Sequence, residues 1–178
     1  LDNVDVAAAS KRGIVVMNAA GGNTVSTAEH TVAMIMALSR NIPQACASMK
    51  GGKWDRNTFK GTELYDKTLG VIGLGRIGST VAKFAKAFGM KVVAYDPFLS
   101  KEIASNKGVD VVELNDLLKT ADFITIHIPK TEETANMISD AQFQMMKKCV
   151  RVVNCARGGI IDEKALTKAL QEKRIGGA

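Results

Sequence analysis

The sequence predicts an α/β protein with a doubly wound parallel sheet. Short apolar runs recur along the chain, and their length and composition are typical of buried parallel strands. They lie at residues 69–72, 92–95, 109–112, 122–128 and 150–153. Segments of helical periodicity separate these runs. Strands that alternate with helices at this pitch form a parallel sheet with helices on both faces.

A glycine-rich turn between the first run and its helix is the most informative stretch. It reads Gly73-Leu74-Gly75-Arg76-Ile77-Gly78. In this spacing the first glycine permits a tight turn, the second lets the backbone approach a pyrophosphate, and the third lets helix and strand pack closely. The start of the helix offers free N–H groups and a positive dipole end to phosphates. The turn therefore predicts a dinucleotide site; a purely structural turn is the alternative.

Asp96 supports the dinucleotide interpretation and indicates which dinucleotide binds. It lies 18 residues past Gly78, where the second apolar run ends. A carboxylate at that place can accept hydrogen bonds from the adenosine ribose and would repel a 2′-phosphate, so it favours NAD over NADP. The unit predicts a Rossmann-like nucleotide-binding domain.

The segment before this unit is expected to be mainly helical. Residues 4–12 predict a short helix closed by Gly13, and residues 14–17 predict a strand. A long helix from Thr24 to Arg40, capped by Thr24 or Ser26, is apolar on nearly every side, so its own domain or a partner subunit must cover it. Pro43 should interrupt it. Residues 50–60 predict a basic loop that contains the only tryptophan of the sequence, Trp54. This loop is either simply exposed to solvent or has a role in an interface or in anion binding.

Five further helices complete the predicted domain. The first, after the glycine turn, should bury Ile77, Val81, Phe84 and Phe88 and end at Gly89. The others are expected at residues 101–106 and 113–119, from a capping box at Ser139, and after a cap at Asp162.

Composition excludes several functional classes. The chain has 178 residues, a net charge of +6 and 46% hydrophobic residues, and neither a signal peptide nor an apolar stretch of membrane-spanning length. Acidic and basic residues are interleaved, so neither a nucleic acid nor a membrane is an expected partner. The cysteines Cys46, Cys149 and Cys155 lack metal-ligand spacing, so no metal is expected. Reduced, buried cysteines in a cytoplasmic protein are the better interpretation.

Arg157 is a candidate substrate-binding residue on local chemistry. It follows the last apolar run in a glycine-flanked turn, ahead of a helix whose dipole disfavours a cation. A guanidinium there could hold a carboxylate and polarise a neighbouring carbonyl oxygen. An ordinary surface arginine is the alternative.

Three segments resemble the signatures of the D-isomer-specific 2-hydroxyacid dehydrogenases. They are GNTVSTAEHTVA from Gly22, the glycine turn itself, and VNCARGGIID from Val153. Within that family, NIPQACASMKGGKW from Asn41 and NCARGG from Asn154 most resemble the phosphoglycerate dehydrogenase branch. The resemblance implies the nucleotide-binding domain of a two-domain dehydrogenase that uses NAD to oxidise 3-phosphoglycerate to 3-phosphohydroxypyruvate, the entry to serine biosynthesis.

The resemblance also implies roles for individual residues. Arg76 and Ile77 would contact the pyrophosphate and Asp96 the ribose hydroxyls, while Ile128, Cys155 and Ala156 would line the cofactor cleft. Arg157 would be the catalytic arginine, binding the substrate carboxylate and carbinol oxygen next to the cofactor, and Asn23 would lie at the hinge near the substrate. The long helix from Thr24 and the Trp54 loop would build a homodimer or homotetramer.

This chain departs from the family in what it lacks. The family's catalytic histidine and glutamate come after the position of Ala178, and most of the substrate-binding domain precedes Leu1. We therefore expect an NAD-binding domain, residues 1–178, truncated at both ends and inactive alone. His127 ends a strand beside the cleft and has the chemistry of a base. The resemblance implies a base elsewhere in the family, so His127 is expected to be a cleft-wall residue, with a catalytic role as the alternative.

Two alternatives stay open at this point. Another D-2-hydroxyacid dehydrogenase, of the glyoxylate or hydroxypyruvate reductase type, would share the same domain. Some relatives of the family are NAD-sensing corepressors, so an NAD-binding interaction module is also possible in principle. Lys53 and Arg56 in the basic loop favour a phosphorylated substrate and make Arg56 a candidate substrate-binding residue.

Overall fold

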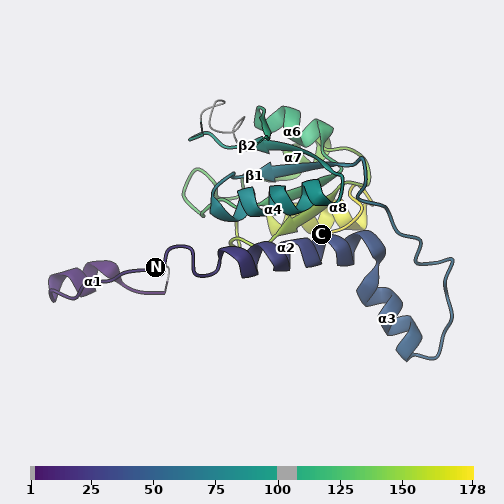
Figure 1. Cartoon of the computed structure of the whole chain (residues 1–178), viewed down its shortest axis with the longest axis horizontal. Coiled ribbons are helices and arrows are strands. Elements are labelled where there is room, and N and C mark those ends of the chain that lie inside the picture. Colours follow the sequence, from purple (N-terminus) through teal and green to yellow (C-terminus); the bar gives the residue numbers. More distant parts are fainter. Residues whose placement is uncertain (1–2, 100–107) are drawn as a thin grey trace.

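Five parallel strands form the centre of the molecule, and they confirm the predicted fold class. The computed structural model describes residues 3–99 and 108–178 (Figure 1). The strands are β1 (Thr68–Ile72), β2 (Lys91–Tyr95), β3 (Asp110–Val111), β4 (Phe123–Ile126) and β5 (Arg151–Asn154), and their order in the sheet is β3-β2-β1-β4-β5. The chain thus winds outward from β1 in both directions. The predicted helix at residues 101–106 lies outside the described residues.

Alternate strand residues face two separate cores, as a sheet covered on both faces requires. Leu69 and Val71 of β1 and Phe123 of β4 belong to one buried cluster, whereas Ile72 and Ile124 belong to the other. Gly70 permits close packing on the second face, because a Cβ there would lie 2.5 Å from Leu117 Cδ2.

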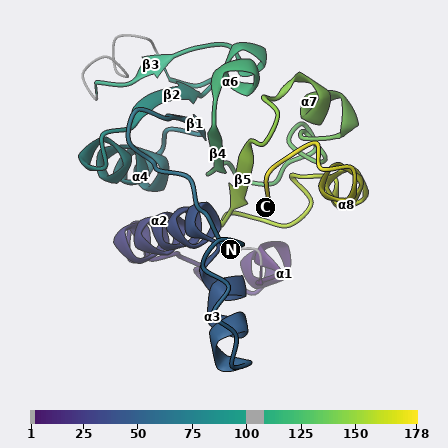
Figure 2. The same ribbon diagram turned by 90° about the vertical axis from the view of Figure 1, so that its right-hand side faces the viewer.

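Helices cover both faces (Figure 2). α2 (Thr24–Arg40) and α4 (Arg76–Ala87) contribute to the first core, and α6 (Leu114–Thr120), α7 (Asp140–Met145) and α8 (Glu163–Gln171) to the second. The capping box at Ser139 and the Asp162 cap are both present. α1 (Val6–Lys11) and α3 (Ile42–Lys50) project from this body (Figure 1).

α2 is only partly covered. Ala28, Thr31, Ile35 and Ser39 form its buried face, and Val25 and Met34 remain exposed. The helix ends at Asn41, whose φ of 53° is left-handed, and α3 begins at the next residue. The predicted interruption at Pro43 is therefore real, but the break falls two residues earlier, and Pro43 occupies the first turn of α3, where a proline ring fits.

Several local predictions were wrong. Residues 14–17 form no strand: Ile14, Val15 and Met17 are 56%, 77% and 84% exposed, and no described strand lies beside them to pair with. Asn23, rather than Thr24 or Ser26, occupies the N-cap of α2, without a side-chain hydrogen bond.

Two predictions of burial were also wrong. Phe88 is exposed, since the buried face of α4 is formed by Gly78, Val81, Ala82 and Ala85, and Phe88 lies past the end of the helix. The cysteines are free, but Cys46 and Cys149 are exposed and only Cys155 is partly covered.

None of the helices in residues 3–99 and 108–178 is both long and apolar enough to span a membrane.

Candidate functional site

The glycine turn joins β1 to α4 at the point where the strand order reverses, which is where ligands bind in open α/β sheets. Gly73 has a φ of +93°, and a Cβ on it would lie 2.8 Å from the His127 carbonyl oxygen. A Cβ on Gly78 would lie only 2.0 Å from the Gly73 carbonyl oxygen, whereas one on Gly75 would meet nothing within 4 Å. Two of the three glycines are thus required by the fold, and Gly75 leaves space in front of the turn.

Asp96 supports the turn as well as facing the cleft. Its Oδ2 accepts a hydrogen bond from the Leu74 N–H at 2.9 Å, and its Oδ1 accepts one from the Phe98 N–H at 3.0 Å. These bonds fix the carboxylate at the end of β2, directly against the glycine turn. The spacing in the sequence predicted this location, but it did not reveal that the carboxylate also holds the turn.

An apolar cleft of about 550 Å³ opens beside Asp96. Gly73 and Gly75 form one wall of this cleft together with Asp96. The other residues that line it include Tyr95, Pro97, Phe98, Ile128, Pro129 and Met137. A cleft of this size and apolar character, with one oriented carboxylate at its edge, fits an adenosine group.

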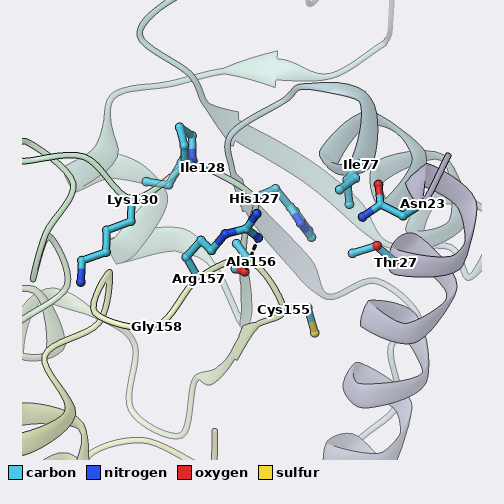
Figure 3. A pocket seen from close by; sticks show the side chains of 11 residues that line it. Asn23, Thr27, Ile77, His127, Ile128, Lys130, Cys155, Ala156, Arg157 and Gly158 are labelled. Carbon is cyan, nitrogen blue, oxygen red and sulfur yellow. Dashed lines mark hydrogen bonds between the residues drawn. The ribbon is translucent and has the colours of Figure 1, made fainter. Parts of the chain in front are cut away.

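A second cleft, of about 630 Å³, brings together most of the other predicted residues. Figure 3 shows Asn23, Thr27 and Ile77 on one side of it and Ile128, Lys130 and Arg157 on the other, with His127 between them. Cys155, Ala156 and Gly158 complete the wall near Arg157. Sequence reasoning missed Thr27 and Lys130; Thr27 could have been found, since it lies one helical turn after Asn23.

The Arg157 turn is shaped by a neighbour that the sequence did not single out. Asn154 Nδ2 donates to the Arg157 carbonyl oxygen at 2.9 Å, and its Oδ1 accepts from the Ala156 N–H at 3.0 Å. Arg157 Nη1 donates to the Ala156 carbonyl oxygen at 2.9 Å. The dipole argument for Arg157 was wrong, because α8 begins only at Glu163; the side chain is an exposed cation on a clamped turn.

His127 is a neutral part of the cleft wall. Its Nε2 lies 3.0 Å from the Oγ1 of Thr125, a buried hydroxyl. Burial lowers the pKa of His127 from 6.5 to about 4, because the interior disfavours the charged imidazolium. An imidazole with so low a pKa is a poor proton acceptor at neutral pH, in agreement with its assignment to the wall.

The stability of the chain should therefore fall as pH is lowered. The unfolded chain protonates His127 near pH 6.5 and the folded chain only near pH 4, so the contribution is complete above 6.5 and is lost through this interval. The difference corresponds to about 3 kcal/mol. Urea unfolding at pH 7 and pH 5 should show about 2 kcal/mol of this loss, since pH 5 lies about 1.5 units below the unfolded pKa, and in His127→Asn this part of the pH dependence should disappear. An equal pH dependence in the variant would contradict the assignment.

Arg56 lies outside both clefts. It occupies the exposed loop after α3, beyond the C-terminal end of α2, while Asn23 precedes the N-terminal end of that helix. Seventeen helical residues, roughly 25 Å, separate the two ends. A single chain therefore does not bring Arg56 to Arg157.

Comparison with known proteins identifies the family. Residues 32–178 match the family described as D-isomer specific 2-hydroxyacid dehydrogenase, NAD binding domain. The chain belongs to this family. Its cofactor is therefore NAD, which agrees with the clefts on either side of the glycine turn. Within residues 3–99 and 108–178, no cluster of three or more His, Cys, Asp or Glu residues could hold a metal ion.

Individual relatives place the chain more closely within the family. It is 57% identical to D-3-phosphoglycerate dehydrogenase of Synechocystis sp. over 178 residues, which are 100% of this chain and 32% of that protein. The same enzyme of Methanocaldococcus jannaschii is 56% identical over 98% of this chain and 34% of its own length. The chain thus spans about a third of these relatives.

A solved structure confirms the fold assignment. D-lactate dehydrogenase from Aquifex aeolicus, complexed with NAD and lactic acid, superposes with a TM-score of 0.88 and 38% identity. The match covers 99% of this chain and 53% of that one.

Proposed function

We propose that this chain is the NAD-binding part of a dehydrogenase that oxidises 3-phosphoglycerate to 3-phosphohydroxypyruvate, the first committed step towards serine. The observation that carries the proposal is the convergence of the glycine turn, Asp96 and Arg157 on two adjoining clefts at the carboxyl ends of the strands. The identity to D-3-phosphoglycerate dehydrogenases, with 51% or more over the whole chain, supports this substrate over other 2-hydroxy acids.

In this proposal the two clefts divide the cofactor between them. Asp96 accepts hydrogen bonds from the adenosine ribose, and the adenine lies in the apolar cleft beside Phe98. Arg76 and Ile77 hold the pyrophosphate at the start of α4, where the first backbone N–H groups of the helix lack intrahelical partners. Ile128, Cys155 and Ala156 line the space for the nicotinamide half.

Arg157 holds the substrate. Its guanidinium binds the carboxylate and the 2-oxygen, and it stabilises the negative charge that develops on that oxygen as the 2-hydroxyl loses its proton. The bound NAD supplies the acceptor for the hydride that leaves C2. Asn23 borders the same cleft from the start of α2 and completes the substrate side.

The hydroxyl proton requires a base that this cleft does not supply. His127 is the only histidine among the described residues that line it, and its low pKa and its bond to Thr125 disfavour that role. We propose that the base belongs to a part of the enzyme outside residues 1–178. The chain alone then binds the cofactor without turning over substrate.

Calorimetric titration of this chain with NADH and with NADPH tests the cofactor part. We expect saturable NADH binding and NADPH binding weaker by about tenfold or more, because the fixed Asp96 carboxylate repels a 2′-phosphate. In Asp96→Asn the charge is removed, but the amide can accept only one of the two backbone N–H bonds, so both affinities should fall while their ratio approaches one. Equal affinities in the unaltered chain would refute the role given to Asp96.

Assembly into a homo-oligomer is part of the proposal and would explain Arg56. Val25 and Met34 of α2, Met49 of α3 and Trp54, which is 73% exposed, form apolar surface that a second copy of the chain could cover. Because Arg56 lies far from Arg157 in one chain, it can reach substrate only in the cleft of a second copy. The protein is then a cytoplasmic homodimer or homotetramer acting on a small molecule.

Kinetics of the longer enzyme test the basic loop. Replacing Lys53 and Arg56 together by glutamine should raise the KM for 3-phosphoglycerate by about tenfold or more and leave the KM for NAD unchanged, since each lost charge-assisted hydrogen bond is worth a factor of this order. Sedimentation analysis must show the same assembly as the unaltered enzyme. An unchanged KM would remove both residues from the substrate site.

A second candidate function follows from the structural neighbours. Chains solved as D-lactate dehydrogenases share this domain at 36–38% identity, so a different 2-hydroxy acid could be the substrate. A substrate series on the longer enzyme separates the two, since only a phosphoglycerate dehydrogenase should prefer the phosphorylated acid. An NAD-sensing interaction module would bind NADH yet oxidise neither.

A further inference from the structure

A cluster of basic side chains surrounds a small cavity at the amino-terminal ends of the strands, whereas the cofactor clefts lie at their carboxyl ends. The cavity measures about 170 Å³ and lies where β4 and β5 begin. Lys67, Lys147, Lys148 and Arg151 line it together with Asp122 and Thr62. Figure 1 shows the segment that returns from the loop after α3 entering β1 at this edge. Four cations and one carboxylate leave a formal excess of three positive charges.

The single carboxylate is already engaged. Asp122 Oδ1 lies 3.0 Å from Lys147 Nζ, and its Oδ2 accepts the Thr68 N–H at 2.9 Å. Asp66, which precedes Lys67, pairs with Lys91 at 2.8 Å, and this hydrogen-bonded pair is the main reason why the pKa of Asp66 is lowered, with a smaller contribution from Lys67. The carboxylates near the cavity therefore leave most of its positive charge uncompensated.

Arg151 is anchored by two contacts but keeps one buried donor without an acceptor among the described residues. Its Nη2 donates to Thr62 Oγ1 at 3.0 Å, and its guanidinium stacks on the Phe123 ring at 5.5 Å. Its Nε is buried and has no hydrogen-bond acceptor in the described part of the chain, nor does a described carboxylate lie within ion-pair distance. A buried N–H donor of a guanidinium costs folding free energy unless a hydrogen-bond acceptor or an anion pairs with it.

We propose that this cavity binds a phosphate group, either free phosphate or the phosphate of a monoester. A phosphate offers four oxygens to donors that surround it, and Arg151 can meet two of them with its planar fork while Lys67 and Lys148 supply further charge. The cavity volume suits a group of this size. Bound phosphate would tie the segment at Thr62 to the first residues of β5, and it would act at a distance from the cofactor clefts.

The proposal is independent of the proposed function, and nuclear magnetic resonance of this chain tests it. A ¹⁵N-labelled sample is titrated with inorganic phosphate, with methyl phosphate, and with sodium chloride at matched ionic strength. We expect saturable shifts of the backbone amides of Thr62, Asp122 and Arg151 with phosphate and not with chloride. Shifts from both phosphate compounds indicate a site open to monoesters, and shifts from phosphate alone indicate one closed around the free ion.

Variants assign the binding to the cluster. The double variant Lys67→Gln and Lys148→Gln should weaken phosphate binding by about tenfold or more. Lys83→Gln with Lys119→Gln, two exposed lysines outside the cluster, is the matched control and should bind as the unaltered chain does. NADH affinity should be equal in all three proteins, which separates this site from the cofactor clefts.

Four results would overturn the proposal. The first three are the absence of saturable shifts, equal shifts with chloride, and shifts confined to the glycine turn at residues 73–78, where phosphate would take the place of a pyrophosphate. The fourth is an unchanged phosphate affinity in the Lys67 and Lys148 variant.

Discussion

Gly78→Ala should unfold this domain more easily and abolish NADH binding. The added Cβ would lie 2.0 Å from the Gly73 carbonyl oxygen and 3.2 Å from Val71 Cγ1, and the first of these is a backbone atom of the glycine turn. Relief requires α4 to move away from β1, which disrupts the packing of both. We expect the free energy of unfolding to fall by about 3 kcal/mol, the upper range for overpacking a core, as measured by urea denaturation.

Gly75→Ala is the matched control, because it adds the same methyl group three residues earlier. No atom lies within 4 Å of a Cβ at Gly75, and its φ of −68° suits any residue. Its free energy of unfolding should stay within about 1 kcal/mol of the unaltered value. NADH binding should still weaken, since the methyl group stands in front of the turn. If Gly78→Ala were as stable as Gly75→Ala, the close approach of α4 and β1 would be disproved.

Arg157→Gln should remove nearly all activity from the longer enzyme while leaving the domain intact. We expect kcat/KM for 3-phosphoglycerate to fall by about 10³, the size of effect found when one donor to a developing oxyanion is removed. Stability should change little, because Arg157 is exposed and its turn is held by the Asn154 side chain through the Arg157 main-chain oxygen. Steady-state kinetics and urea denaturation measure the two quantities separately.

Arg157→Lys distinguishes charge from shape. Lysine keeps the cation but loses the planar fork, so kcat/KM should recover only in part if the guanidinium binds two substrate oxygens at once. NADH titration of the 178-residue chain supplies the second control: all three proteins should bind with affinities within a few-fold. Full activity of Arg157→Gln would remove Arg157 from the proposed mechanism, and full activity of Arg157→Lys would show that its charge alone suffices.

Local patterns predicted the elements that depend on local chemistry. The apolar runs have the length of buried strands, and the glycine spacing of residues 73–78 is typical of a strand-turn-helix unit. Together they were enough to predict β1, α4, β2 and the place of Asp96 after β2. The capping box at Ser139 and the cap at Asp162 are equally local, and both are present.

Patterns failed where partners from other elements decide. Residues 14–17 are as apolar as a strand, but no strand of the described chain lies beside them, and an isolated strand lacks hydrogen-bond partners. Phe88 continues the apolar spacing of α4, yet the helix ends before it, and the side chain is exposed. The helical periodicity of a sequence shows which face of a helix is apolar, but it does not show where along the helix other elements pack against that face.

The candidate site divides in the same way. Short motifs of consecutive residues were enough to indicate the family and the cofactor and to make Asp96 and Arg157 candidate site residues. The packing of distant elements was needed to show that Asn23, His127 and Arg157 share one cleft and that Arg56 does not line it. It also decided that burial keeps His127 neutral and that the turn rests on Asp96 and Asn154. Distance and burial arise from packing between elements far apart in the chain, and no local pattern encodes them.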